Sequence, residues 1–268
     1  MEYIFFGTPD FAAIILEKLI KAGMPPVAVV CNPDRPVGRK KIITPPPSKV
    51  LAEKHGIKTY QPEKLGIDDL WSKIAEMDFA VVAAYAKIIP KEILEIPRLG
   101  TIGVHPSLLP KYRGSSPIQS VILNGESETG VTLFLADEKV DHGKIVASIK
   151  YKVSNDETYE TLVKKLAELG GDLLVETLPK FLKGEINPLP QDESQATYTK
   201  KFINEDGYVD LEKDKPEIIE RKIRALNPEP GVWTMINNKR TKLLEAKLID
   251  GKLKITKIQI EGKKPQFV

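Results

Sequence analysis

The sequence has a single cysteine, Cys31, among its 268 residues. One cysteine excludes an internal disulfide framework and also excludes metal sites built from paired thiolates. No apolar run approaches the ~20 residues that a membrane-spanning helix needs, and the N-terminal segment lacks the basic and then apolar stretches of a secretory signal. We therefore expect a cytoplasmic protein that binds no metal and does not associate with membranes.

Two glycine-rich nucleotide-binding motifs are also missing. No GxGxxG pattern follows the first apolar run, and no GxxxxGK[ST] pattern occurs anywhere in the chain. Such turns bring backbone N–H groups up to the phosphates of dinucleotides and nucleoside triphosphates. The sequence therefore indicates neither a dinucleotide nor a nucleoside triphosphate, and we expect the protein to bind a different ligand.

Net charge is small, at +3, but the basic residues are unevenly distributed. From 239 to 268 there are nine Lys or Arg residues against three acidic ones. Between 31 and 50 the basic residues outnumber the lone Asp34 by four, and they are Arg35, Arg39, Lys40, Lys41 and Lys49. Positive charge gathered in one loop and one tail is typical of a surface that contacts nucleic-acid phosphates. A merely solvated surface would give the same charge pattern.

Apolar patterning in the first half alternates between strand and helix. Short apolar runs at 3–6, 26–31, 78–84 and 101–104 predict strands, and the last two are apolar enough to be buried on both faces. Residues 10–22 carry apolar side chains at helical spacing after a plausible N-cap, Asp10. This order predicts an α/β fold with a Rossmann-like, doubly wound and mostly parallel sheet.

The second half predicts further elements and a second domain. We expect a helix at 116–123, strands at 131–136 and 145–153, and a long helix at 156–182. These elements complete a large domain over 1–183, and a linker over 184–200 follows it. Residues 201–268 predict a small, truncated, barrel-like β domain, with a helix at 216–225 and a hairpin turn at Asp250-Gly251.

Histidine is scarce, with three in the chain, and His105 stands at the end of a predicted strand. In doubly wound sheets ligands bind at the carboxyl ends of the strands, and a histidine there can act as a base or an acid near neutral pH. Asp141 lies in the turn between two predicted strands, where a carboxylate brought near His105 would orient the imidazole. Each residue taken alone also fits a structural role, because Asp141-His-Gly is ordinary turn chemistry.

A long stretch around these two residues is more specific. The run from Gly100 to Ile145, with His105-Pro-Ser-Leu-Leu-Pro-Lys-Tyr-Arg-Gly and Thr129-Gly-Val-Thr before Asp141, resembles the signature of formyltransferases that use 10-formyltetrahydrofolate. Further segments resemble the methionyl-tRNA formyltransferase family in order and cover nearly the whole chain: Phe6-Gly-Thr-Pro-Asp-Phe-Ala-Ala, Asn32-Pro-Asp-Arg-Pro-Val-Gly-Arg-Lys-Lys, Ala84-Tyr-Ala-Lys-Ile-Ile-Pro, Tyr198-Thr-Lys-Lys and Ile223-Arg-Ala-Leu-Asn-Pro-Glu-Pro-Gly-Val-Trp.

The resemblance implies a reaction and a set of site residues. The formyl group of 10-formyltetrahydrofolate would pass to the amino group of initiator methionyl-tRNA, in a protein that we expect to be a monomer. His105 and Asp141 would be catalytic. Ser107, Leu108, Leu109 and Pro110 would line the folate pocket, and Arg39, Lys40 and Lys41 would enter the acceptor stem of the tRNA.

The sequence departs from the family pattern at Gly103, which occupies the position of the family's catalytic asparagine. That amide would stabilise the tetrahedral oxyanion, and losing one such donor costs about 100- to 1000-fold in turnover unless another group replaces it. We hypothesise that His105 accepts the amine proton and then, as imidazolium, stabilises the oxyanion. A second departure follows Ala246, after which the β domain is shorter than the family's.

Two other functions stay open at this stage. An N-formyltransferase acting on a nucleotide-linked amino sugar would share the folate half and the same histidine and aspartate, but it would not require the basic loop and tail. A folate- or tRNA-binding protein that has lost catalysis would account for Gly103, although His105 and Asp141 are both retained.

Overall fold

The computed structural model describes residues 1–38, 40–65 and 74–268. The chain forms two compact units, which are described separately. The first comprises Met1–Arg113, Gly130–Tyr151 and Val163–Thr197, and the second comprises Gly114–Thr129, Lys152–Leu162 and Tyr198–Val268. Each unit therefore combines segments that are far apart in the sequence.

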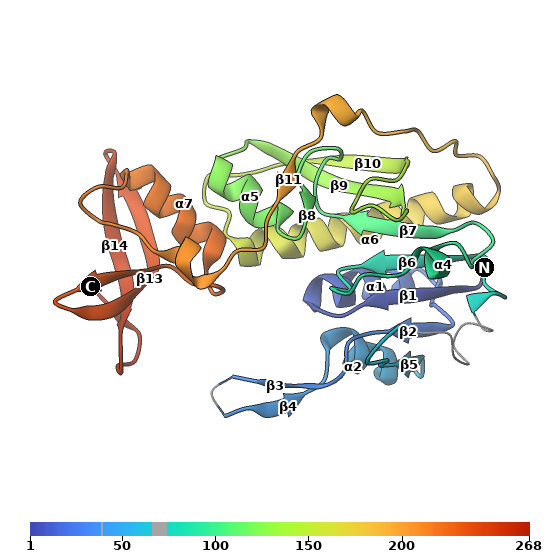
Figure 1. The fold of residues 1–268 in the computed structure, drawn as a ribbon, viewed down its shortest axis with the longest axis horizontal. Coiled ribbons are helices and arrows are strands. Elements are labelled where there is room, and N and C mark those ends of the chain that lie inside the picture. The colour runs from blue at the N-terminus through green and yellow to red at the C-terminus, as the bar shows by residue number, and fades with distance from the viewer. Residues whose placement is uncertain (39, 66–73) are drawn as a thin grey trace. The chain divides into compact units, whose positions relative to one another are not determined.

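The principal sheet has seven strands: β1 (Tyr3–Gly7), β2 (Ala28–Val30), β5 (Lys58–Tyr60), β6 (Phe79–Ala83), β7 (Thr101–His105), β9 (Glu128–Leu135) and β10 (Ile145–Lys152). Their order is β10-β9-β7-β6-β1-β2-β5 (Figure 1). The strands from β5 to β7 are parallel, whereas β9 runs antiparallel to β7. The predicted Rossmann-like, mostly parallel sheet is confirmed.

The strand order reverses at β1. The chain proceeds from β1 outward to β2 and β5, and then returns to the other side of β1 as β6 and β7. The carboxyl ends of β1 and β6 therefore mark the switch point, where ligands of doubly wound sheets bind. The predicted catalytic residue His105 ends β7, the strand beside β6, at this same edge of the sheet.

The central strands are mostly apolar, as is typical of strands that are covered on both faces of a sheet. All five residues of β1 are buried, and so are all five of β7. Tyr3 stacks on Phe79 of the neighbouring strand β6, with ring centroids 4.9 Å apart. Phe6 meets the ring of Tyr85 edge-on at 5.5 Å, so that the core extends to the carboxyl ends of the strands.

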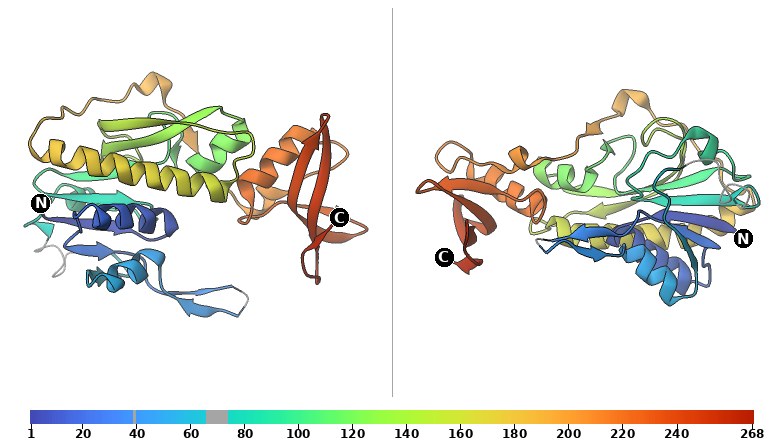
Figure 2. Two further views of the ribbon diagram at one scale, coloured as in Figure 1. Left: turned by 180° about the vertical axis from the view of Figure 1, so that it is seen from behind. Right: turned by 60° about the horizontal axis from the view of Figure 1, so that its bottom comes forward.

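Two helices, α1 (Asp10–Lys21) and α6 (Tyr159–Leu182), lie side by side on one face of the sheet (Figure 2). Lys18 Nζ lies 2.8 Å from Asp172 Oδ1, which joins them. A Cβ added to Gly170 would lie 3.1 Å from Val104 Cγ1, so glycine lets α6 approach β7 closely. Both predicted helices are confirmed, except that Asp10 is the first helical residue and Pro9 is the N-cap.

The described part of the first half also contains two shorter helices, α2 (Pro47–Lys54) and α4 (Lys91–Leu94). The basic segment, which the sequence presents as a loop, is a hairpin of β3 (Arg35–Val37) and β4 (Ile42–Thr44). Its strands have three residues each, too few to show an alternating pattern in the sequence. All six strand residues are exposed, so the strands also lack a buried apolar face that would predict them from the sequence.

The second unit contains helices α5 (Pro117–Asn124) and α7 (Pro216–Leu226) and an antiparallel sheet of four strands: β12 (Trp233–Ile236), β13 (Lys239–Ile249), β14 (Lys252–Ile260) and β15 (Gln266–Phe267). The predicted turn at Asp250-Gly251 joins β13 to β14, and both residues have the positive φ that a two-residue hairpin of type I′ requires. The expected small β domain is confirmed, while the division at 183 and 200 stays a prediction.

Short elements accompany these: the two-residue strands β8 (Arg113–Gly114) and β11 (Tyr198–Thr199), and the 3-10 helices η1 (Glu193–Gln195) and η2 (Asn204–Gly207). In the second unit α7 buries Ile219, Ile223 and Leu226, and its Arg224 donates from Nη1 to the Glu157 carbonyl at 2.8 Å. Across the described ranges, every helix is too short or too polar to cross a membrane.

Candidate active site

His105 is the last residue of β7, and its ring is almost fully buried. The Nε2 atom lies 2.9 Å from the carbonyl oxygen of Tyr112. Because a carbonyl can only accept, Nε2 carries the hydrogen of this bond. The other ring nitrogen, Nδ1, lies 3.5 Å from Asp141 Oδ2. The structure therefore brings the two predicted catalytic residues together, and in the neutral ring Nδ1 is the basic atom beside a carboxylate.

Both groups that flank the His105 ring come from residues in the left-handed region of φ. Tyr112 has a φ of 61° and Asp141 a φ of 50°. Such conformations cost about 1–3 kcal/mol each in residues other than glycine and persist only where the surroundings hold them. Gly143 closes the Asp141 turn, and a Cβ there would lie only 1.6 Å from the Leu135 carbonyl oxygen. Glycine at position 143 is thus required by the turn.

The predicted folate-binding segment follows His105 and is held by its own hydrogen bonds. Ser107 Oγ donates to the Lys111 carbonyl at 2.6 Å, and the Leu109 N–H donates to Thr132 Oγ1 at 3.0 Å. Thr132 Oγ1 in turn donates to the Ser107 carbonyl at 2.7 Å. Leu108 and Pro110 remain half-buried. The segment is a rigid, largely apolar wall, and its contact with a ligand stays a prediction.

Gly103 lies opposite Phe134 in the antiparallel pairing of β7 with β9. A Cβ added to Gly103 would lie 2.3 Å from Phe134 Cε1, a distance that real Cβ atoms essentially never show. The aromatic ring therefore fills the space in which the family's asparagine side chain would begin. The ring thus occupies the volume next to Gly103 on this side of β7.

A buried guanidinium stands next to the site. The side chain of Arg113 has no exposed surface, and its Nη1 donates to Glu193 Oε2 at 3.0 Å. Its Nε and Nη2 donate to Gln191 Oε1 at 3.1 and 2.8 Å. Hydrogen bonding from Arg113 lowers the pKa of Glu193 below its ordinary value. Sequence analysis missed this group because its partners follow about eighty residues later.

A second ion-pair system surrounds His142, the residue after Asp141. His142 Nδ1 lies 2.6 Å from Asp137 Oδ2, and its Nε2 lies 3.6 Å from Glu193 Oε1. The imidazole thus joins the β9 end to the segment that carries Glu193. His142 therefore lies between two carboxylates outside the parallel strands, whereas His105 stands at the carboxyl end of the parallel strand β7.

The three residues predicted to bind tRNA belong to the basic segment that forms the β3–β4 hairpin. Arg39 lies outside the described residues, and Lys40 and Lys41 are exposed between β3 and β4. Lys49, which contributed to the charge excess, pairs with Asp34 at 2.9 Å. Gln61 Nε2 also donates to Asp34 Oδ1 at 2.7 Å. Lys49 therefore anchors the base of the hairpin, while Lys40, Lys41 and Arg35 are exposed on it.

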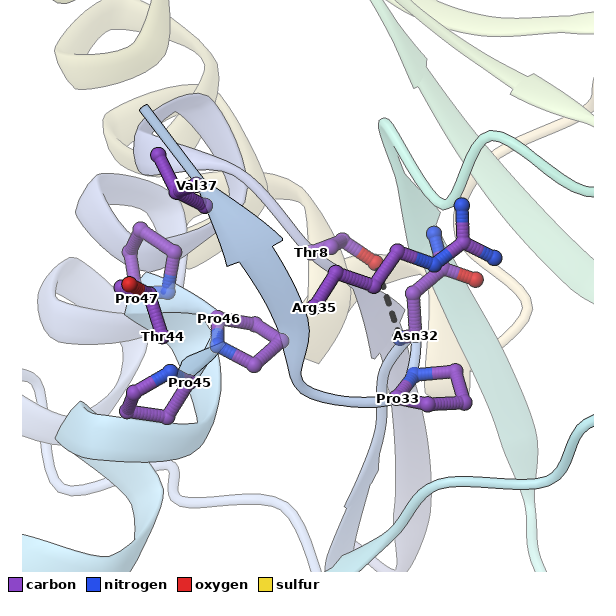
Figure 3. Close-up of a pocket in the computed structure, with 9 residues that line it drawn as sticks. All are labelled: Thr8, Asn32, Pro33, Arg35, Val37, Thr44, Pro45, Pro46 and Pro47. Carbon is purple, nitrogen blue, oxygen red and sulfur yellow. Dashed lines mark hydrogen bonds between the residues drawn. The ribbon is translucent and has the colours of Figure 1, made fainter. Parts of the chain in front are cut away.

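A cavity of about 240 Å³ opens at the base of this hairpin, beside the carboxyl ends of β1 and β2 (Figure 3). Prolines 45–47 form much of its wall, and Thr8, Asn32 and Arg35 contribute polar groups. Asn32 Oδ1 is buried and has no hydrogen-bond partner among the described residues, and neither has the hydroxyl of Tyr85. Burial raises the pKa of Tyr85 to about 12, so its hydroxyl stays a donor.

The doubly wound sheet carries the His105–Asp141 pair at the carboxyl end of β7, the position at which α/β enzymes of this class bind their ligands. Two family descriptions match the chain: formyl transferase over residues 1–178, and formyl transferase, C-terminal domain, over residues 201–254. The chain belongs to the formyl transferase family and is a formyl-transferring enzyme.

Curated relatives are more specific. A protein of Kosmotoga olearia named methionyl-tRNA formyltransferase is 40% identical, over 98% of this chain and 93% of that protein. One of the same name from Halalkalibacterium halodurans is 43% identical, over 91% of this chain and 77% of that protein. The family resemblance found in the sequence is confirmed.

Solved structures show the same fold at lower identity. Methionyl-tRNA formyltransferase from Clostridium thermocellum has a TM-score of 0.63 and 19% identity, and it covers 97% of this chain and 98% of that one. An N-formyltransferase from Helicobacter canadensis, solved with folinic acid and dTDP-3-aminofucose, has a TM-score of 0.67 and 20% identity over 98% of this chain and 95% of that one. The fold alone therefore does not distinguish the two acceptors.

The contact between Gly103 and Phe134 predicts a steric coupling. We expect Gly103→Ala to lower the free energy of unfolding by about 1–3 kcal/mol, because the new Cβ overpacks against the ring. In a Phe134→Leu background the same change should cost less, since the ring atoms that clash are gone. Denaturant unfolding of the four proteins measures this coupling. An equal cost in both backgrounds would contradict it.

Proposed function

We propose that this chain transfers the formyl group of 10-formyltetrahydrofolate to the amino group of initiator methionyl-tRNA in the cytoplasm. The observation that carries the proposal is identity of 40% and 43% over nearly the whole chain to proteins named for that reaction. The exposed hairpin cations Lys40 and Lys41 support a polyanionic acceptor, because a sugar nucleotide would not need them.

The geometry around His105 supports a defined proton path. As the amine nitrogen forms its bond to the formyl carbon, His105 Nδ1 takes a proton from that nitrogen. Asp141 Oδ2, 3.5 Å away, stabilises the resulting imidazolium. When the bond from the formyl carbon to the folate nitrogen breaks, Nδ1 returns the proton to that nitrogen. Atoms and charge balance, and the Nε2 bond to Tyr112 keeps the ring in one orientation.

The oxyanion of the tetrahedral intermediate needs a donor, and Gly103 supplies no side chain. Phe134 fills that position, so a direct amide donor is absent there and the adjoining wall is apolar. An apolar wall lowers the local dielectric and strengthens the attraction between the oxyanion and a nearby cation. The imidazolium of His105 is the cation that this site supplies for the purpose.

The acceptor is tested by offering the purified protein 10-formyltetrahydrofolate with either methionyl-tRNA or dTDP-amino sugars. We expect formyl-methionyl-tRNA and no formylated sugar. Chromatography of the products after mild deacylation distinguishes them. Turnover of the sugar without formylation of methionyl-tRNA would overturn the proposal, and turnover of neither would favour a binding protein.

Loss of the proposed base should reduce the chemical step. We expect His105→Ala to slow single-turnover formyl transfer by about 10²- to 10⁴-fold, the usual contribution of general acid–base catalysis. Asp141→Asn keeps the shape but removes the charge that stabilises the imidazolium, so it should also slow the step. His55→Ala, at an exposed histidine after α2, is the matched control. Near-normal transfer by His105→Ala would remove this residue from the mechanism.

The hairpin cations should appear in the salt dependence of tRNA binding. We expect Lys40→Ala/Lys41→Ala to reduce the slope of log affinity against log salt by up to about 2, because each phosphate contact releases roughly one counterion. Lys164→Ala/Lys180→Ala removes the same charge from exposed positions on α6 and should leave the slope unchanged. Filter binding at several salt concentrations gives the slopes. Equal slopes for the hairpin double variant and the parent would exclude phosphate contacts there.

A further inference from the structure

The segment between the two matched family regions is more than a connection. We call residues 189–197 the strap. It follows α6 and runs along the β10 side of the sheet toward β11 (Figure 1). Its first residue, Leu189, exchanges two backbone hydrogen bonds with Ile145 of β10, at 2.8 and 2.9 Å. The beginning of the strap is therefore hydrogen-bonded to strand β10, and its later residues lie near His105.

Gln191 of the strap holds the turn that carries Asp141. Its Nε2 donates to the carbonyls of Asp141 and Gly143, at 2.9 and 2.8 Å. Its Oε1 accepts from two nitrogens of the buried Arg113. Both amide hydrogens and the amide oxygen are thus used, and a flipped amide would set oxygen against two carbonyls and nitrogen against a guanidinium. The side chain has a single satisfactory orientation.

Thr197, at the other end of the strap, holds the residue that bonds the opposite side of the His105 ring. Its Oγ1 accepts from the Tyr112 N–H at 2.8 Å, and its carbonyl accepts from the Arg113 N–H at 2.9 Å. The Thr197 N–H donates to the Pro110 carbonyl at 3.3 Å. The backbone on both sides of the Tyr112 carbonyl is thereby attached to the strap.

We propose that the strap positions the catalytic imidazole, with Gln191 and Thr197 as positioning residues that act through Asp141 and Tyr112. Both of those residues have left-handed backbones, which L side chains rarely adopt and which external hydrogen bonds must hold. One strap contact restrains each of them. The expected effect on rate rests on the proposed function of His105, but the effect on the ring itself does not.

The first test is Gln191→Glu in the full chain. The carboxylate still accepts from Arg113, but it loses both N–H donors and sets an oxygen against the Asp141 and Gly143 carbonyls. We expect kcat to fall about 10- to 100-fold through misplacement of the site, with KM for the tRNA little changed. Gln195→Glu is the matched control, because the Gln195 amide donates to Asp192 within the strap. It should leave kcat unchanged.

A merely structural tether would leave the His105 ring unchanged. The chemical shifts of its ring nitrogens therefore distinguish a positioning role from a structural one. Protein labelled with ¹⁵N-histidine contains three imidazoles. The signal that disappears in His105→Ala is the signal of His105. We expect its ring nitrogen shifts at fixed pH to change in Gln191→Glu and to stay at their normal values in Gln195→Glu. Normal His105 shifts and normal kcat in Gln191→Glu would overturn the proposal, as would equal changes in the control.

Thr197 gives an independent variant pair should Gln191→Glu fail to fold. Thr197→Ser keeps the hydroxyl acceptor for the Tyr112 N–H, whereas Thr197→Val has the same shape without it. We expect Val to shift the His105 signals and lower kcat, and Ser to restore both. Identical behaviour of the two variants would contradict the positioning role. If the His105 signals shift in the strap variants but His105→Ala is fully active, the catalytic role of His105 is wrong, while the strap still positions the ring.

Discussion

The hydrogen bond from His105 Nε2 to the Tyr112 carbonyl is the constraint on which the rest of the site depends. It commits one ring nitrogen to the protein, so that chemistry at this ring has to take place on the Nδ1 side, where Asp141 lies. A backbone carbonyl cannot become a donor, and the ring orientation is therefore the same before and after protonation. This carbonyl comes directly after the segment that its own hydrogen bonds hold next to the strand of His105.

Holding that bond requires backbone conformations that are locally unfavourable. Tyr112 and Asp141 are both left-handed, and the structure restrains them with contacts from a segment more than forty residues further along the chain. Arg113 lies between these contacts, fully buried and bonded to Gln191 and Glu193. A buried guanidinium is tolerated only when its donors are satisfied, so the strap and Arg113 stabilise each other. The unfavourable backbone conformations of Tyr112 and Asp141 are thus offset by hydrogen bonds that also satisfy the buried Arg113 side chain.

Gly103 and Phe134 depend on each other through steric packing rather than through hydrogen bonds. Antiparallel pairing of β9 with β7 places the two residues opposite each other, and the ring takes the volume that a side chain at 103 would need. The loss of an amide donor and the presence of a large ring at the facing position are consequently one feature of the packing. Restoring an asparagine at 103 therefore also requires a smaller residue at 134.

The sequence by itself determined the alternation of strands and helices, the hairpin turn at Asp250-Gly251, and the family to which the chain belongs. Apolar period and turn chemistry are local properties, and they can be read from neighbouring residues. The tertiary structure alone decided that Tyr112 bonds His105, that Phe134 covers Gly103, and that the strap holds the site. Those contacts involve backbone atoms or residues up to 85 positions apart, for which a single sequence carries no signal.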